Sequence, residues 1–145
     1  MSKLKLKIAT PERVLFDEDV TEVVVPTTTG VLTILPNHTA LISEIVPGEM
    51  IIRDGKTEKI ALVFGGFLNV KAGSEVIILA DSAEHIHEIA EKEAEEAKKR
   101  AEKLMSESVG DKERYAEAQA MLAKNLLRLQ MVKKHRSHRG TKINQ

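Results

Sequence analysis

Two histidines and a glutamate, His85, His87 and Glu91, come nearest in this chain to a metal-ligating set. Imidazole nitrogens and carboxylates are common ligands of divalent transition metals. On a β-strand, His85 and His87 would lie on one face and could share a metal, because side chains alternate along a strand. On a helix, residues two apart point to different faces. Because residues 88–100 have the composition of a helix, we expect a solvated helix start here.

The same spacing is similar to the metal motif of cupins, which are β-barrel enzymes. The first half of this chain is also rich in β-forming residues, but the glycine expected downstream in cupins is missing. A metal-dependent cupin-like enzyme is therefore kept as an alternative. It predicts bound metal in the purified protein and loss of that metal on His87→Ala.

A basic segment, Lys133–Arg139, allows three interpretations. It could bind nucleic acid, complement the negative end of a helix macrodipole, or contact an acidic protein surface. The chain has 22 basic and 22 acidic residues, 3% aromatic residues and no Trp, so its net charge is zero. A nucleic-acid-binding protein usually carries a clear positive excess and aromatic side chains for stacking. We therefore expect no nucleic acid as partner and keep that function as an alternative.

Composition excludes several classes of chemistry. The chain has no Cys, which excludes disulfides, thiol nucleophiles and cysteine-ligated metal clusters. No phosphate-binding or dinucleotide-binding glycine motif is present. No apolar run approaches the ~20 residues that span a bilayer, and Met1–Lys7 alternates Lys and Leu unlike a signal peptide. We expect a protein of a reducing compartment, cytosolic or stromal, with no cofactor or metal.

The 145 residues divide into two parts of opposite composition. All four Pro lie in the first third, six of the eight Gly lie between Gly30 and Gly73, and residues 83–109 have neither. Since Gly and Pro mark turns, the change near Asp81 predicts a domain boundary. We expect a β domain at 1–82, a helical part at 83–135 and a basic, frayed tail at 136–145.

The first part predicts short strands. Segments with strand-like patterning are 3–8, 20–25, 31–35, 49–53, 59–64, 67–70 and 75–79. Asp54-Gly55-Lys56 between two of them is a hairpin signal, because Asp and Gly tolerate positive φ. Gly65-Gly66 is interpreted as a bulge or tight backbone crossing. Short strands with frequent turns predict a β-sandwich or barrel.

The second part predicts two helices joined by a turn at 106–111. Apolar residues recur at intervals of three and four, and many of them are Ala. Asp81 or Ser82 could cap the first helix, and the second runs from about 112 to 134. The pair predicts an antiparallel hairpin. Ala buries little area, so the hairpin is either an ordinary stable one or only a few kcal/mol from another arrangement.

Five blocks in this order resemble the epsilon subunit of F-type ATP synthase. They are Leu6-Lys7-Ile8-Ala9-Thr10-Pro11-Glu12, Val23-Val24-Val25-Pro26 with Gly30, Ile34 to Ile42 (which resembles the family's Leu-Pro-Gly-His-x-x-Leu), Gly65-Gly66-Phe67-Leu68-Asn69-Val70, and Val76-Ile77-Ile78-Leu79-Ala80-Asp81. An Ala- and Glu-rich hairpin follows, as in the family. The resemblance extends to about residue 134.

The resemblance implies an N-terminal ten-stranded β-sandwich and a C-terminal antiparallel two-helix hairpin. It implies a non-catalytic central-stalk rotor subunit that binds the gamma subunit and the c-ring and couples proton or sodium flow to ATP synthesis. The hairpin would reach the alpha/beta catalytic head and inhibit ATP hydrolysis. The expected location is peripheral, on the cytoplasmic face of the bacterial plasma membrane rather than on a thylakoid.

The resemblance also implies two sets of contact residues. The interface with gamma and the c-ring would include Thr10, Gly30, Val31, Asn37, His38 and Ser43. The inhibitory contact with an acidic segment of the beta subunit would include Lys124, Arg128, Lys133, Lys134 and Arg136. His38 matches the family's His, although a loop residue that caps backbone groups is an alternative interpretation.

Some members of the family bind ATP through Ile/Leu-Asp-x-x-Arg-Ala at the start of the hairpin. The matching stretch here is Ile86-His87-Glu88-Ile89-Ala90-Glu91, and only Ile86 fits. His87 stands in place of the Asp, and Ala90 in place of the Arg. We therefore expect weak ATP binding or none.

Overall fold

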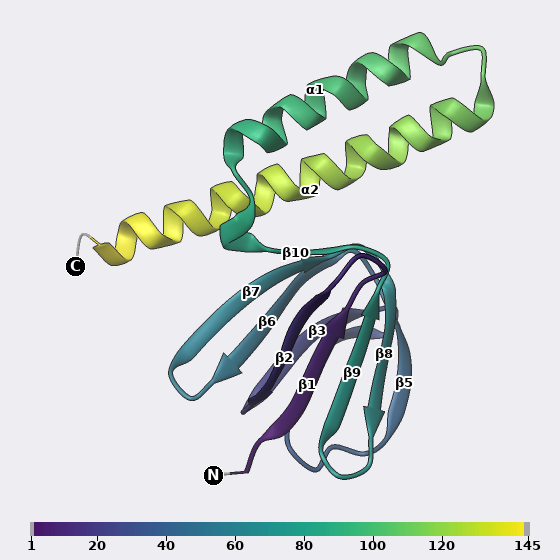
Figure 1. The fold of residues 1–145 in the computed structure, drawn as a ribbon. Helices are drawn as coiled ribbons and strands as arrows, with labels where there is room; N and C mark the ends of the chain where they lie inside the picture. The colour runs from purple at the N-terminus through teal and green to yellow at the C-terminus, as the bar shows by residue number, and fades with distance from the viewer. Residues whose placement is uncertain (1, 144–145) are drawn as a thin grey trace. The chain divides into compact units, whose positions relative to one another are not determined.

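A computed structural model describes the backbone of residues 2–143 and the side chains of residues 2–135. The chain divides into two compact units, Met1–Ile86 and His87–Gln145. Ten β-strands build the first unit and two α-helices build the second (Figure 1). The expected ten-stranded β-sandwich followed by a two-helix hairpin is confirmed.

The strands are β1 Leu4–Ala9, β2 Val14–Val20, β3 Glu22–Thr27, β4 Gly30–Ile34, β5 Leu41–Ile45, β6 Gly48–Asp54, β7 Thr57–Val63, β8 Gly66–Lys71, β9 Glu75–Ala80 and β10 Ala83–His85. Their order is β10-β7-β6-β3-β5-β8-β9-β1-β2, and β4 pairs with β3. Apart from the parallel pair β1–β9, all of these pairs are antiparallel. The sheet curls around one core, as the ribbon of the β unit shows (Figure 1).

Alternation of side chains builds this core. In β1, Leu4, Leu6 and Ile8 are fully buried, while the intervening Lys5 and Lys7 are exposed. In β9, which pairs with β1, Val76, Ile78 and Ala80 are buried with the same period of two. The pattern read from the sequence at 3–8 therefore corresponds to a half-buried strand.

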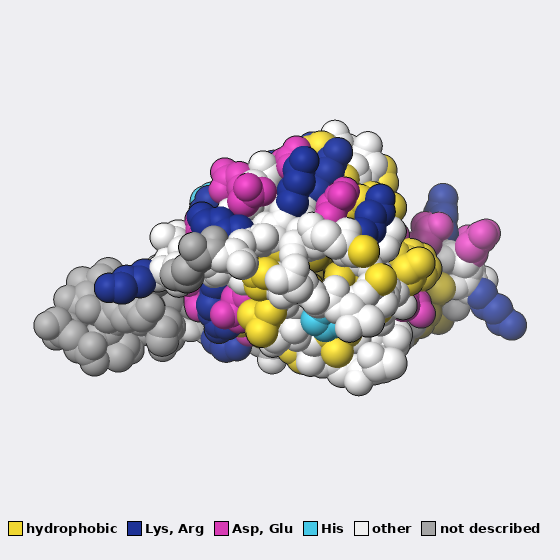
Figure 2. Space-filling model, turned by 90° about the horizontal axis from the view of Figure 1, so that it is seen from below, with side chains coloured by type: hydrophobic (Ala, Val, Ile, Leu, Met, Phe, Trp, Pro, Cys, Tyr) yellow, Lys and Arg dark blue, Asp and Glu magenta, His cyan; other side chains and the backbone are white. Residues whose placement is uncertain are grey.

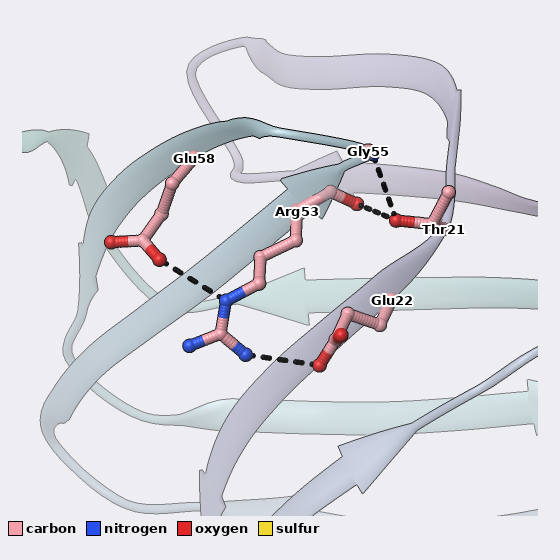
Figure 3. A network of polar contacts seen from close by, with 5 residues as sticks. All are labelled: Thr21, Glu22, Arg53, Gly55 and Glu58. Carbon is pink, nitrogen blue, oxygen red and sulfur yellow. Dashed lines mark hydrogen bonds and ion pairs between the residues drawn. The ribbon is translucent and has the colours of Figure 1, made fainter.

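A polar network closes the end of the sheet where β6 turns into β7 (Figure 3). The Arg53 guanidinium donates to Glu58 at 3.1 Å and to Glu22 at 3.0 Å, so it joins strands β3, β6 and β7. The hydrogen bond to Glu58, and next the one to Glu22, raise the pKa of Arg53 above its ordinary value. Thr21 Oγ1 donates to the Arg53 carbonyl oxygen and accepts from the Gly55 N–H. The network therefore fixes the Asp-Gly hairpin that the sequence predicts.

Three strands lie outside the segments predicted from patterning: β2, β5 and β10. β2 carries three consecutive acids, Asp17 to Asp19, which hide its alternation. β10 follows the predicted boundary at residue 82, and its residues pair with Val63 to Ala61 of β7. This pairing extends the β unit to Ile86, so Asp81 and Ser82 cap no helix.

The second unit contains helices α1 Glu91–Glu107 and α2 Lys112–Ile143. Glu91 and Glu93 lie in the first turn of α1, where negative charge complements the helix dipole. Asp111 caps α2, since its carboxylate accepts from the Arg114 N–H at 3.2 Å. The predicted second helix at 112–134 lies within α2, which continues to Ile143. The basic, frayed tail expected at 136–145 stays a prediction, because the side chains from 136 onward lie outside the described ones.

No helix in the described part of the chain is long and apolar enough to cross a membrane.

Candidate functional site

The loop between β4 and β5 holds two of the predicted contact residues, Asn37 and His38. The Asn37 N–H donates to Ser74 Oγ at 2.7 Å, and Ser74 Oγ donates to Asn37 Oδ1 at 3.3 Å. Asn37 and Ser74 both have positive φ and each lies in a tight turn. Their hydrogen bonds therefore join these two turns. This loop therefore lies against the β8–β9 turn and has a defined shape.

His38 is half-buried and held by backbone groups of its own loop. Its N–H donates to the Leu35 carbonyl at 3.2 Å, and its Nδ1 lies 2.8 Å from the Thr39 carbonyl oxygen. A carbonyl only accepts, so Nδ1 carries the proton and Nε2 is the nitrogen available to a partner. Figure 2 views the molecule from below and shows hydrophobic side chains exposed near the middle of this face.

The other predicted contact residues lie elsewhere in the sheet. Gly30 pairs with Thr27 of β3, and Thr27 also pairs with Ile45 of β5. Ile45 in turn pairs with Gly66, so Gly30 lies toward the end of the sheet where β8 begins. Asn37 lies at the opposite end, near Ser74. The structure therefore separates Gly30 and its neighbour Val31 from the Asn37–His38 loop by the length of β4.

Thr10 and Ser43 have structural surroundings of their own. Thr10 closes a turn, because its Oγ1 accepts from the Arg13 N–H and donates to the Arg13 carbonyl, both at 3.1 Å. Ser43 is half-buried and alternates with exposed Ile42 on β5, so it faces the core side together with Leu41. The structure does not bring these two residues to the His38 loop.

An exposed apolar surface on strands β5, β8 and β9 was missed by sequence reasoning. We call Ile42, Phe67 and Leu79 the outer apolar face; their exposed fractions are 74%, 58% and 59%. Phe67 pairs directly with Leu79, and its partner on β5, Glu44, lies two positions from Ile42. The available signal was consecutive apolar residues such as Ile77-Ile78-Leu79, which give a strand two apolar faces. Clustered exposed apolar side chains indicate an interaction site.

The glycine pair before β8 has a structural role. Gly66 has a φ of 130°, and a Cβ there would overlap the Leu79 carbonyl oxygen. Gly65, with a φ of 100°, accepts the Asp81 N–H on its carbonyl at 3.1 Å. The interpretation of Gly65-Gly66 as a tight backbone crossing is confirmed.

In the hairpin, a polar contact joins the two helices. The Arg128 guanidinium donates to Glu93 Oε2 at 2.6 Å and to Asn125 Oδ1 at 2.8 Å. The Arg128 side chain is 9% exposed, and Asn125 is also buried and donates to the Met121 carbonyl. We call Glu93, Asn125 and Arg128 the polar latch. The buried side chains of α1 are Ala94, Ala97 and Ala101.

The predicted cations of α2 thus differ in their surroundings. Arg128 points into the hairpin and is bound to Glu93, whereas Lys133 and Lys134 are exposed and Lys124 is half-buried. Arg136 lies outside the described side chains. The basic residues described on α2 therefore do not form one uniform exposed row.

The histidines of the possible metal motif lie in different elements. His85 belongs to β10, and its Nε2 lies 3.0 Å from the Leu15 carbonyl oxygen. His87 is exposed in the short turn Ile86–Glu88 that precedes α1. Among the described residues, no group of three or more His, Cys, Asp or Glu is arranged to hold a metal ion.

Comparison with known proteins agrees with this architecture. The β-sandwich domain of the ATP synthase delta/epsilon chain matches residues 3–86, and the long α-helix domain of the same chain matches residues 87–133. ATP synthase epsilon chains of Dehalococcoides mccartyi (strain BAV1) and Clostridium novyi are each 42% identical, over 138 and 129 residues. These alignments cover 95% and 88% of this chain and 98% and 96% of the relatives.

Two solved structures share this fold at low sequence identity to the chain. A chain in the cryo-EM structure of the Euglena gracilis mitochondrial ATP synthase (OSCP/F1/c-ring) superposes with a TM-score of 0.69 at 18% identity, covering 84% of this chain and 76% of that chain. A chain in the Tetrahymena thermophila mitochondrial ATP synthase central stalk/c-ring structure gives a TM-score of 0.59 at 18% identity, covering 90% and 97%. Both the family models and the curated relatives span nearly all of the sequence, so the chain belongs to the ATP synthase delta/epsilon family, among its epsilon chains.

Proposed function

We propose that this chain is a non-catalytic central-stalk subunit of F-type ATP synthase that couples ion flow through the c-ring to ATP synthesis by other subunits. The observation that carries the proposal is the outer apolar face, Ile42, Phe67 and Leu79, on a sandwich with a continuous core. Burying a side chain of this size in a partner contributes about 1.5–3 kcal/mol. Such a surface suits a part that binds firmly and transmits torque without deforming.

The β unit would bind the gamma subunit through the outer apolar face. The residues that the family implies for the gamma and c-ring interface lie at both ends of the sandwich, Gly30 and Val31 at one end and Asn37 and His38 at the other. The c-ring would be contacted from one of these two ends. These contacts would hold the protein peripherally at the cytoplasmic face of a bacterial plasma membrane.

The hairpin would inhibit ATP hydrolysis by leaving its closed form and reaching the catalytic head. The polar latch supports this proposal, because small Ala side chains fill the buried positions of α1 and an ion pair joins it to α2. Arg128 cannot pair with Glu93 and with an acidic beta-subunit segment in the same geometry. Lys133, Lys134 and Arg136 would therefore make the first inhibitory contacts, and Lys124 and Arg128 would join when the latch opens.

A binding experiment tests the division of labour. Residues 1–86 and the full chain are titrated against the catalytic head made of alpha, beta and gamma. We expect closely similar affinities, because the proposed gamma-binding surface belongs entirely to the first unit. No binding by the full chain would overturn the proposal, and binding lost only in the shorter chain would move the gamma-binding surface to the hairpin.

A further inference from the structure

Asp54-Gly55, at the turn between β6 and β7, is the only Asp-Gly pair in the sequence. Such a pair is chemically labile, because glycine has no side chain to shield its backbone nitrogen. Once it has lost its proton, the Gly55 nitrogen attacks the side-chain carboxyl carbon of Asp54: an N–C bond forms, a C–O bond breaks and water leaves. Water then opens the five-membered imide at either carbonyl, which returns Asp or leaves isoaspartate. In isoaspartate the main chain runs through the former side chain.

The folded hairpin opposes this ring closure through the backbone of Asp54. Asp54 is the last residue of β6 and pairs with Thr57 of β7. Extended backbone turns the nitrogen of the next residue away from the Asp54 side chain, whereas the imide needs the two within bonding distance. The reaction therefore requires the hairpin to open locally, and its rate follows the population of the open form.

Thr21 holds the chain on both sides of Asp54 (Figure 3). Its Oγ1 donates to the Arg53 carbonyl oxygen at 2.9 Å and accepts from the Gly55 N–H at 3.1 Å. The Thr21 N–H donates to the same Arg53 carbonyl at 2.9 Å. The Asp54 carboxylate also pairs with Lys3 at 3.0 Å, but both side chains are more than 40% exposed, so this ion pair restrains the turn little. The Thr21 hydroxyl is therefore the main restraint on the nitrogen that would attack.

We propose that Asp54-Gly55 is a latent isoaspartate site and that Thr21 is the positioning residue that keeps it closed. Isoaspartate would add one carbon atom to the main chain inside the hairpin. The Asp54–Thr57 pair would then lose its register, and Arg53 would no longer be held between its two glutamates as it is now. The modification would accumulate in chains whose hairpin has opened, and it would prevent the hairpin from closing in its native form.

Thr21→Val tests this restraint, because valine keeps the β-branched shape and removes only the hydroxyl. The full-length variant and the parent chain are incubated at neutral pH and physiological temperature, and isoaspartate at position 54 is measured by peptide mapping that separates the two isomers. We expect it to accumulate roughly tenfold faster in the variant, since two hydrogen bonds that hold the hairpin are lost.

Thr21→Ser, which keeps the hydroxyl, is the matched control and should isomerise at the parent rate. Asp81-Ser82 in the same chain is the internal reference. A folded Thr21→Val protein that isomerises at the parent rate contradicts the proposal. An equal rise at Asp81 would assign the effect to global unfolding and overturn the role of Thr21.

Two measurements on the parent chain keep the test decisive if Thr21→Val does not fold. Hydrogen exchange should show the Gly55 amide protected, because it donates to Thr21 although the turn is exposed. Isoaspartate at position 54 should accumulate at least about tenfold more slowly in the native chain than in the same chain unfolded in urea. Rapid exchange of the Gly55 amide, or equal accumulation in the two states, would overturn the proposal.

Discussion

At the scale of single residues, Arg128 is the predicted contact residue whose surroundings differ most from what the sequence suggests. In the sequence it is one of several cations spaced along α2. In the structure its guanidinium is buried and bound to Glu93 on the other helix and to Asn125 on its own. Sequence alone could not reveal this, because the pairing depends on the register of the two helices. Removing the partner of a buried charge lowers the free energy of unfolding more than removing the partner of an exposed charge.

Removing the carboxylate that pairs with Arg128 should therefore loosen the hairpin. For Glu93→Met we expect the free energy of opening to fall by about 1–3 kcal/mol, because the buried guanidinium loses a charge-assisted contact. Hydrogen exchange at the amides of Ala94 to Ala101 measures this opening. Lys103→Met is the control; it breaks an exposed pair with Glu107 on α1 and should cost at most about 0.5 kcal/mol. Equal protection in the two variants would refute a stabilising latch.

Gly66 makes a second prediction at the residue scale. Gly66→Ala should lower the free energy of unfolding by about 2 kcal/mol or more, since its Cβ would overlap backbone of β9. Gly73→Ala, also at positive φ but with open space around it, should lower it by only about 1–2 kcal/mol. Urea denaturation of the two variants compares them. A Gly66→Ala protein as stable as Gly73→Ala would mean that the crossing is loose.

At the scale of elements, predictability followed the regularity of each pattern. β1 and β9 were predicted closely because their apolar residues alternate or run continuously. β2 and β5 were not predicted, because acidic and polar residues interrupt their apolar patterns. β10 has three residues and exists through its pairing with β7, a long-range contact that no local pattern encodes. The predicted strand at 67–70 was correct, but which face of it is solvent-exposed depends on the curl of the sheet.

The outer apolar face makes a prediction about this sheet. Phe67→Glu should weaken binding to the catalytic head by about tenfold or more, because it places a charge in the surface that the gamma subunit would bury. The fold should remain, since Phe67 is exposed. Val109→Glu, at the exposed turn between the helices, is the control for an added carboxylate. Affinity and thermal stability are measured on both, and unchanged affinity for Phe67→Glu would remove this face from the interface.

At the scale of the whole molecule, the family blocks in the sequence predicted the architecture and left the site incomplete. Asn37 and His38 were expected together and are together, because they are neighbours in one loop. Gly30 was expected with them, but β4 carries the chain to the other end of the sheet. A linear motif does not show how far a strand separates its ends.

The start of the hairpin makes a prediction about ligands. Ile86 to Glu91 form a short turn and the beginning of α1, with His87 and Ala90 in place of the Asp and Arg of the ATP-binding motif. Titration calorimetry of the full chain with ATP should give no saturable heat at millimolar ATP. A dissociation constant at or below about 1 mM, equivalent to about −4.1 kcal/mol, would contradict this expectation.

The most direct test of the central claim is a titration of ATP hydrolysis. The catalytic head of alpha, beta and gamma is titrated with the full chain and with residues 1–86, which keep β10 and its pairing with β7. The account predicts that both chains bind and that only the full chain inhibits hydrolysis. If neither chain binds the head, the assignment as a stalk subunit is contradicted; if both bind and neither inhibits, the inhibitory role of the hairpin is contradicted.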